Sequence, residues 1–202
     1  MNKGLLLVIS GPTGAEKDKI IASLLEKHSE IYKEVSYTTR EKKEDEVEGK
    51  EFNFITNKEF FDKVDKGMFL EWAEVYDGVY YGTPKHNILR KLKEGKDVLV
   101  EVDIKGALQI KEKYNNAVLI IILPKSKESM ESNILNSKKG TAEKLTRKFN
   151  SAFNCINSIN SINKYNYGVV NTSIEEGVYK IENIITAERC RVDNIDSSTF
   201  LK

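Results

Sequence analysis

The chain has 202 residues, enough for one α/β domain with small inserted subdomains and a buried core. Its 32 lysines and arginines balance 31 aspartates and glutamates, so the formal charge is +1 and there is no basic excess for nucleic acid or a membrane surface. Cys155 and Cys190 match neither a CxxC motif nor a metal spacing, which indicates free thiols in a reducing compartment. Because no apolar run suits a membrane span or a signal peptide, we expect a cytoplasmic protein.

The segment at residues 5–17 reads as a buried strand, a glycine-bearing loop and the beginning of a helix. In such a unit the loop N–H groups and the positive end of the helix dipole surround an anion such as phosphate. The phosphate-loop pattern G-x-x-x-x-G-K-[ST] is matched only in part. Gly11 and Lys17 are in place, but Glu16 stands at the second glycine and Asp18 at the hydroxyl position. The residues alone leave two interpretations, a phosphate site or a strand–turn–helix corner without a ligand.

Short continuous apolar strands then alternate with helical patterns along the chain. This alternation is typical of an α/β fold in which a parallel sheet is covered by helices on both faces. The helix near residue 83 is expected to begin with Thr83 as its cap and Pro84 as its first residue. We predict further core strands at 97–103, 118–123 and 167–170, and helices at about 17–30, 83–94, 106–114, 126–137, 142–163 and 174–191.

Residues 32–81 do not show this alternation of apolar strands and helices. The Asp77-Gly78 pair is a strong signal for a tight hairpin between 69–76 and 79–81. Asn57 is a suitable cap for a short helix that Gly67 would end. With further strand-like pieces at 35–40 and 51–55, this block is interpreted as an inserted, mostly antiparallel subdomain.

Polar residues suited to a nucleotide are concentrated in this insert. Ser36 and Arg40 lie near a strand end and offer a hydroxyl and a fork-shaped cation for phosphate. Glu71 stands among apolar residues and is suited to accept N–H groups of a purine, while Tyr81 and Thr83 add hydroxyls. Ligands of open α/β sheets bind at the carboxyl ends of the strands, so we expect these residues to face the glycine-bearing loop.

Seven ordered segments between about residues 4 and 191 resemble the signatures of guanylate kinases. They are 10–15, 35–40, 69–76, 80–84, 101–107, 165–171 and 187–189. The resemblance implies a P-loop nucleoside monophosphate kinase fold, with a parallel core sheet flanked by helices, an inserted mixed-β subdomain that binds GMP, and a small helical lid. It places the core at 1–31, 82–125 and 164–192, the insert at 32–81, the lid at about 126–163 and a polar tail at 193–202.

The resemblance also implies transfer of the γ-phosphoryl of Mg·ATP to GMP, giving ADP and GDP, and it assigns the residues involved. The GMP side would be Ser36, Arg40, Lys43, Phe52, Glu71, Tyr81, Thr83 and Asp103. The ATP side would be Gly11, Thr13, Gly14, Ala15, Glu16, Lys17, Asp18 and Lys19, with Asp18 as the candidate ligand of Mg²⁺. The catalytic cations would be Lys17, Arg40, Arg147 and Lys148.

Departures from the family pattern concentrate on the ATP side. Glu16 adds a negative charge, and its side chain resists the positive φ that glycine tolerates. The lid segment 133–140 holds only lysines where arginines are usual, with a later basic pair at 147–148. On the GMP side, Lys43 replaces a second arginine, Phe52 replaces a tyrosine and Lys105 replaces a glutamine. Lysine is a point charge and does not reproduce the bidentate fork of arginine.

Three interpretations follow. The first is an active guanylate kinase in which Lys17, Asp18 and Lys19 hold Mg·ATP. The second is an impaired homologue that keeps a GMP pocket and serves as a nucleotide-binding or protein-interaction module. The third, a kinase for another monophosphate, is disfavoured by the intact Glu71, Thr83 and Asp103. GMP and ATP are the expected ligands, nucleic acid and membranes are not expected partners, and a protein partner is expected only for the second interpretation.

Overall fold

The computed structural model describes residues 4–76, 78–136, 143, 145–146, 149–150 and 162–194. Its centre is a five-stranded sheet in the order β2-β7-β1-β8-β9, in which every neighbouring pair is parallel. The α/β class and the parallel core are therefore confirmed. The strands are β1 (Leu6–Ser10), β2 (Tyr32–Lys33), β7 (Val98–Glu101), β8 (Val118–Pro124) and β9 (Tyr167–Asn171).

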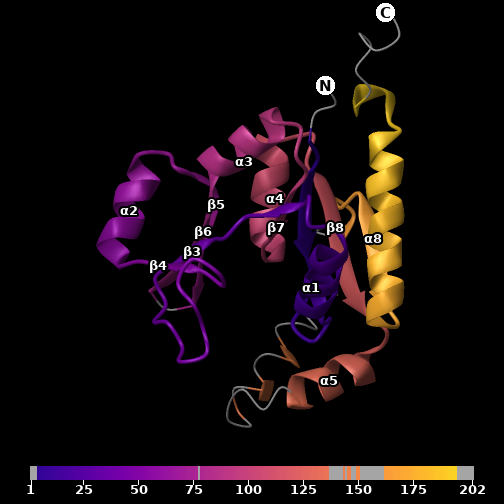
Figure 1. Ribbon diagram of the computed structural model, residues 1–202. Coiled ribbons are helices and arrows are strands. Elements are labelled where there is room, and N and C mark those ends of the chain that lie inside the picture. Colours follow the sequence, from indigo (N-terminus) through magenta and orange to yellow (C-terminus); the bar gives the residue numbers. More distant parts are fainter. Residues whose placement is uncertain are drawn as a thin grey trace, which may run out of the picture.

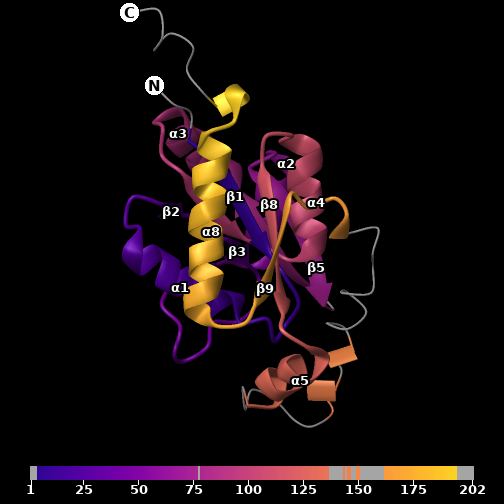
Figure 2. The ribbon, with the colours of Figure 1, turned by 90° about the vertical axis from the view of Figure 1, so that its right-hand side faces the viewer.

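Helices cover both faces of this sheet (Figures 1 and 2). One face packs on α1 (Lys17–Lys27) and α8 (Ile174–Arg189), and the other on α3 (Lys85–Lys93) and α4 (Ile104–Lys113). Successive residues of β1 alternate between the two apolar layers, which is why its sequence is apolar throughout. The sheet is thus a rigid platform whose strand ends carry the loops.

The insert lies beside the core, on the side away from α8 (Figure 1). It is a four-stranded sheet in the order β4-β3-β6-β5, packed with α2 (Asn57–Asp65). The predicted hairpin is present, because β5 (Phe69–Tyr76) and β6 (Val79–Pro84) pair antiparallel. The pair β3 (Tyr37–Thr38) and β4 (Asn53–Phe54) is parallel, so the sheet is mixed.

Several boundaries differ from the sequence prediction. β2, counted within the 32–81 block, pairs with β7 of the core sheet, and β6 continues the insert sheet to Pro84. The helix expected from Thr83 begins at Lys85, because Pro84 is extended and the Thr83 hydroxyl bonds elsewhere. Thr56 caps α2 in place of Asn57, through a capping box with Glu59.

The predicted lid begins with α5 (Lys127–Asn136), and a short 3₁₀ helix, η1 (Val192–Asn194), follows α8. Most of the helix expected at 142–163 lies outside the described residues, as do Lys138, Lys139, Arg147 and Lys148. Within the described ranges, no helix is both long and apolar enough to cross a membrane.

Candidate functional site

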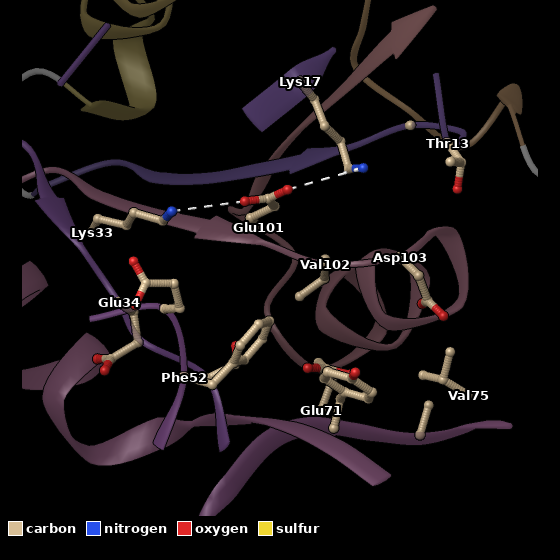
Figure 3. A pocket seen from close by; sticks show the side chains of 15 residues that line it. Thr13, Lys17, Lys33, Glu34, Phe52, Glu71, Val75, Glu101, Val102 and Asp103 are labelled. Carbon is tan, nitrogen blue, oxygen red and sulfur yellow. Dashed lines mark ion pairs between the residues drawn. The ribbon is translucent and has the colours of Figure 1, made fainter. Parts of the chain in front are cut away.

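A cavity of about 320 Å³ opens between the carboxyl ends of β1 and β7 and the insert sheet (Figure 3). The core provides the loop after β1, the first turn of α1 and the ends of β2 and β7. The insert provides β5, β6 and the segment before β4. The lining residues are Gly11, Thr13, Lys17, Lys33, Glu34, Ser36, Glu51, Phe52, Glu71, Ala73, Val75, Tyr81, Glu101, Val102 and Asp103.

The loop after β1 contains positions with glycine-like backbone and a close approach to β8. A Cβ at Gly11 would lie 2.2 Å from the carbonyl oxygen of Ile122, so the loop can pass β8 only with glycine there. Glu16 has φ 56° and ψ 31°, and among the described residues it is the only non-glycine with positive φ. Residue 16 therefore has the positive φ that glycine tolerates and that the Glu side chain resists. Left-handed backbone costs a residue with a side chain roughly 1–2 kcal/mol.

The Glu16 carboxylate is paired with a neighbouring cation. Lys19 Nζ lies 2.5 Å from Glu16 Oε1, and this contact raises the pKa of Lys19. Two amides, not anticipated from the sequence, fix the loop from outside: Asn133 of α5 donates to the Gly14 carbonyl at 2.9 Å, and Asn171 of β9 donates to the Ala15 carbonyl at 3.0 Å. These contacts hold the loop in place. Of its two acidic residues, Glu16 and Asp18, the charge of Glu16 is compensated by Lys19.

A row of charges runs from the loop along the edge of the core sheet. Lys17 Nζ is 3.9 Å from Glu101 Oε1, and Lys33 Nζ is 3.7 Å from Glu101 Oε2 (Figure 3). Glu101 therefore holds the loop lysine at the mouth of the cavity. The position of Glu101 at the end of a core strand was the available signal for this role.

Glu71 and Thr83, which are expected to contact guanine, form a hydrogen-bonded chain with the half-buried Ser36. The Thr83 hydroxyl donates to Glu71 Oε1 at 2.5 Å, so Ser36, 3.3 Å from the Thr83 oxygen, is the donor in the next link. Burial and the neighbouring Asp103 raise the pKa of Glu71 to about 7. Asp103 caps α4 by accepting from the Gly106 N–H at 2.7 Å. Glu71 also packs closely on Gly106, where a Cβ would lie 2.8 Å from its Oε2.

The expected phosphate-binding residues are grouped around Arg40. Its Nε donates to the Tyr81 hydroxyl at 3.1 Å, and its guanidinium makes a bidentate contact with Glu46 at 2.7 and 2.8 Å. This contact lowers the pKa of Glu46 to about 2 and raises that of Arg40. Arg40 also lies over the ring of Phe52, 5.3 Å from its centroid. Lys43 Nζ is 3.9 Å from Glu46, outside the cavity lining.

The structure thus brings most of the expected residues to one cavity. Gly11, Thr13, Lys17, Ser36, Phe52, Glu71, Tyr81 and Asp103 line it directly. Thr83 and Arg40 contact lining residues, while Gly14, Ala15, Glu16, Asp18 and Lys19 belong to the loop and first turn beside it. Arg147 and Lys148 lie outside the described residues. No sequence pattern points to Glu34 or Glu46, because their contacts exist only in the folded chain.

The residues beside Lys17 fit a magnesium ion bound together with nucleotide phosphates. Within the described ranges, no group of three or more His, Cys, Asp or Glu side chains is placed to hold a metal by itself. Magnesium in phosphoryl-transfer sites commonly uses one or two carboxylates plus substrate phosphates and water. Asp18 is exposed in the first turn of α1, directly after Lys17, and suits that mode.

A glycine-bearing loop after the central strand, which shares one cavity with an inserted sheet, defines the P-loop nucleoside monophosphate kinase class of fold. A family model described as guanylate kinase matches residues 3–188, so the chain belongs to the guanylate kinase family.

Similar proteins agree with this assignment. A guanylate kinase of Clostridium tetani is 46% identical over 100% of this chain and 94% of its own length. A guanylate kinase of Clostridium perfringens is 48% identical over 96% of this chain and 88% of its own length. The crystal structure of guanylate kinase from Anaplasma phagocytophilum superposes with a TM-score of 0.80 at 29% identity, covering 100% of this chain and 94% of that one.

Proposed function

We propose that this chain is an ATP:GMP phosphotransferase that converts ATP and GMP to ADP and GDP. The observation that carries the proposal is the hydrogen-bonded chain Ser36–Thr83–Glu71, whose two ends, Ser36 and Glu71, line one cavity with Lys17 of the loop after β1. An acceptor and a donor nucleotide bound at these two places would meet phosphate to phosphate.

We assign the acceptor base to the buried end of the cavity. The ionised Glu71 would accept N–H groups of guanine, and Asp103, at the N-terminus of α4, lies beside it. Adenine has no N–H on the ring nitrogen that corresponds to guanine N1, so a buried carboxylate favours guanine. Preference for GMP over AMP would therefore come from Glu71.

The GMP phosphate would bind near Tyr81, Arg40 and Ser36. Arg40 uses four of its five N–H groups within the protein, for Tyr81, the Glu41 carbonyl and Glu46. One N–H remains for a phosphate oxygen, and the Tyr81 hydroxyl, which accepts from Arg40, keeps its proton to donate. Arg40 would thus act partly by orienting Tyr81.

Lys17 would contact the ATP phosphates, and Asp18 would hold Mg²⁺ with them. The bound Mg²⁺ supplies positive charge to the phosphate oxygens. An oxygen of the GMP phosphate bonds to the γ-phosphorus, the bond from the γ-phosphorus to its bridging oxygen breaks, and that electron pair leaves with ADP. Catalysis then depends mainly on positioning and charge neutralisation. Arg147 and Lys148 are proposed to contribute cations from the lid.

We also infer a cytoplasmic role in purine nucleotide metabolism. The free, exposed Cys190 thiol supports a reducing compartment. GMP and ATP are the proposed partners.

A second candidate is an impaired kinase that binds GMP through the same pocket. It is favoured by Glu16, which brings both a carboxylate and a left-handed backbone to the loop that is proposed to hold ATP. The two candidates differ in ATP binding and in turnover.

The deciding experiment is calorimetric titration with GMP and with Mg·ATP, followed by an ADP-release assay with both. Binding of both ligands with GMP-dependent ADP release is expected. GMP binding without ATP binding or turnover would establish the impaired kinase. A panel of nucleoside monophosphates with no preference for GMP would overturn the acceptor assignment.

A further inference from the structure

α5 lies directly against the glycine-bearing loop that the proposed function assigns to ATP. It follows β8 and lies beyond the carboxyl end of that strand (Figures 1 and 2). Met130, Asn133 and Ile134 have the i, i+3, i+4 spacing of one helix face, and this face meets the loop at Gly14. A Cβ at Gly14 would lie 2.8 Å from the Met130 carbonyl oxygen and 3.0 Å from Ile134 Cγ1. The contact therefore leaves no room for a larger residue at this position.

One hydrogen bond crosses the contact between α5 and the loop. The half-buried Asn133 side chain donates from its amide to the Gly14 carbonyl at 2.9 Å. On the other edge of the same peptide, the Ala15 N–H donates to the Pro12 carbonyl at 3.3 Å. A trans peptide is planar with its C=O and N–H opposed, so these two bonds together fix the rotation of the 14–15 peptide. One of them comes from α5 and the other from the loop itself.

The 14–15 peptide is a point at which the loop could otherwise rotate. Gly14 has φ 88°, and glycine has a wide choice of backbone conformations, so rotation beside it meets little steric resistance. Phosphate loops bind anions through N–H groups, and a carbonyl that turned toward the phosphates would repel them. When only a fraction of a protein is in the binding-competent state, its affinity for the ligand is reduced by that fraction.

We propose that Asn133 is a positioning residue of the ATP site. It keeps the Gly14 carbonyl turned toward α5 and away from the nucleotide phosphates, so that ATP binding depends on the docked position of α5. The inference rests on the proposed function, because it takes the loop to be the ATP site. Coupling between two sites is reciprocal, so bound ATP should in turn stabilise the docked position of α5.

The experiment compares Asn133→Ala with Asn136→Ala by calorimetric titration with Mg·ATP and, separately, with GMP. Asn136 lies on the same helix, is exposed and donates to the Ser132 hydroxyl, so its replacement changes helix propensity in the same direction without a contact to the loop. Asn133→Ala should weaken Mg·ATP binding about five- to tenfold and leave the GMP affinity within about twofold. Asn136→Ala should bind both ligands like the unmodified protein.

Amide hydrogen exchange provides a readout that a purely structural role would not move. Mg·ATP should slow exchange in α5 of the unmodified protein, because ligand and docked helix stabilise each other. This protection should be reduced in Asn133→Ala and kept in Asn136→Ala. GMP alone should leave the exchange of α5 unchanged.

Equal Mg·ATP affinity in Asn133→Ala and the unmodified protein would overturn the inference, even if the variant had a lower Tm. If the variant does not fold, the unmodified protein decides, since α5 exchange that Mg·ATP leaves unchanged would also overturn the inference. GMP-dependent ADP release together with either result would leave the proposed function standing. Absence of Mg·ATP binding by the unmodified protein would reject both.

Discussion

Glu16 combines an unfavourable backbone conformation with an unfavourable charge at the phosphate loop. Its φ of 56° suits glycine, and its carboxylate would face the ATP phosphates if Lys19 did not hold it. We expect Glu16→Gly to raise the free energy of unfolding by roughly 0.5–1 kcal/mol, because the left-handed residue loses its side chain. Denaturant unfolding measures this change. GMP-dependent turnover should stay within about threefold, because the Lys19 contact already compensates the charge.

Lys19→Ala provides the complementary test. Freeing the Glu16 carboxylate should raise the KM for ATP about five- to tenfold, and the effect should vanish in the Glu16→Gly/Lys19→Ala double variant. A large rise in ATP affinity and turnover in Glu16→Gly alone would instead support the impaired kinase.

The Arg40 guanidinium contacts the Tyr81 hydroxyl and the Glu46 carboxylate and lies over the ring of Phe52. Arg40→Lys should raise the KM for GMP by about 10- to 100-fold. Lysine cannot contact Tyr81 and both Glu46 oxygens together. The Glu46 charge would then be left uncompensated near the proposed position of the GMP phosphate. Steady-state kinetics with GMP varied at saturating ATP measures it. The KM for ATP serves as the internal control, and an equal rise in both constants would contradict the assignment.

At the scale of elements, β5 of the insert and α4 of the core meet where Glu71 packs on Gly106, so the insert contacts the core at the end of the cavity that is proposed to bind guanine. Elsewhere in a helix, Gly→Ala is stabilising by about 1 kcal/mol. Here the new methyl would press on the Glu71 carboxylate at 2.8 Å. We predict that Gly106→Ala raises the KM for GMP at least tenfold, measured by steady-state kinetics, while the helix content is kept.

Gly168→Ala in β9 is the matched control. Its Cβ would meet only Ile121, at an ordinary distance of 3.9 Å, so the kinetics should hardly change. Equal kinetic losses in the two variants would show that the Gly106 effect is not specific to Glu71.

For the whole molecule, the sequence predicts best what depends on continuous apolar runs. The strands that became β1, β7 and β8 were recognised because both faces are buried, and the glycine-bearing loop was recognised because it directly follows β1. β2 was missed as a core strand because Tyr32–Lys33 is two residues long and carries no such run. The sequence pattern favours Thr83 as a helix cap, because its bond to Glu71 exists only once β5 and β6 pair.

The stability of the whole molecule should depend on pH through His28. It follows α1, and its Nε2 lies 2.9 Å from Glu182 Oε1 on α8, while its Nδ1 lies 3.0 Å from Glu30 Oε1. These contacts, with Glu182 first, raise the pKa of His28. A raised pKa means that the stabilising contribution is complete below the unfolded value of about 6.5 and is lost as the pH rises through the folded value.

We therefore expect His28→Gln to lower the Tm more at ~pH 5.5 than at ~pH 8.5, because only the imidazolium bridges both carboxylates. Thermal unfolding followed by circular dichroism at both pH values measures the difference. His86→Gln is the matched control, since His86, the second histidine, is exposed on α3 and should give the same Tm change at each pH. A Tm loss for His28→Gln that does not vary with pH would mean that the ring joins α1 to α8 by packing alone.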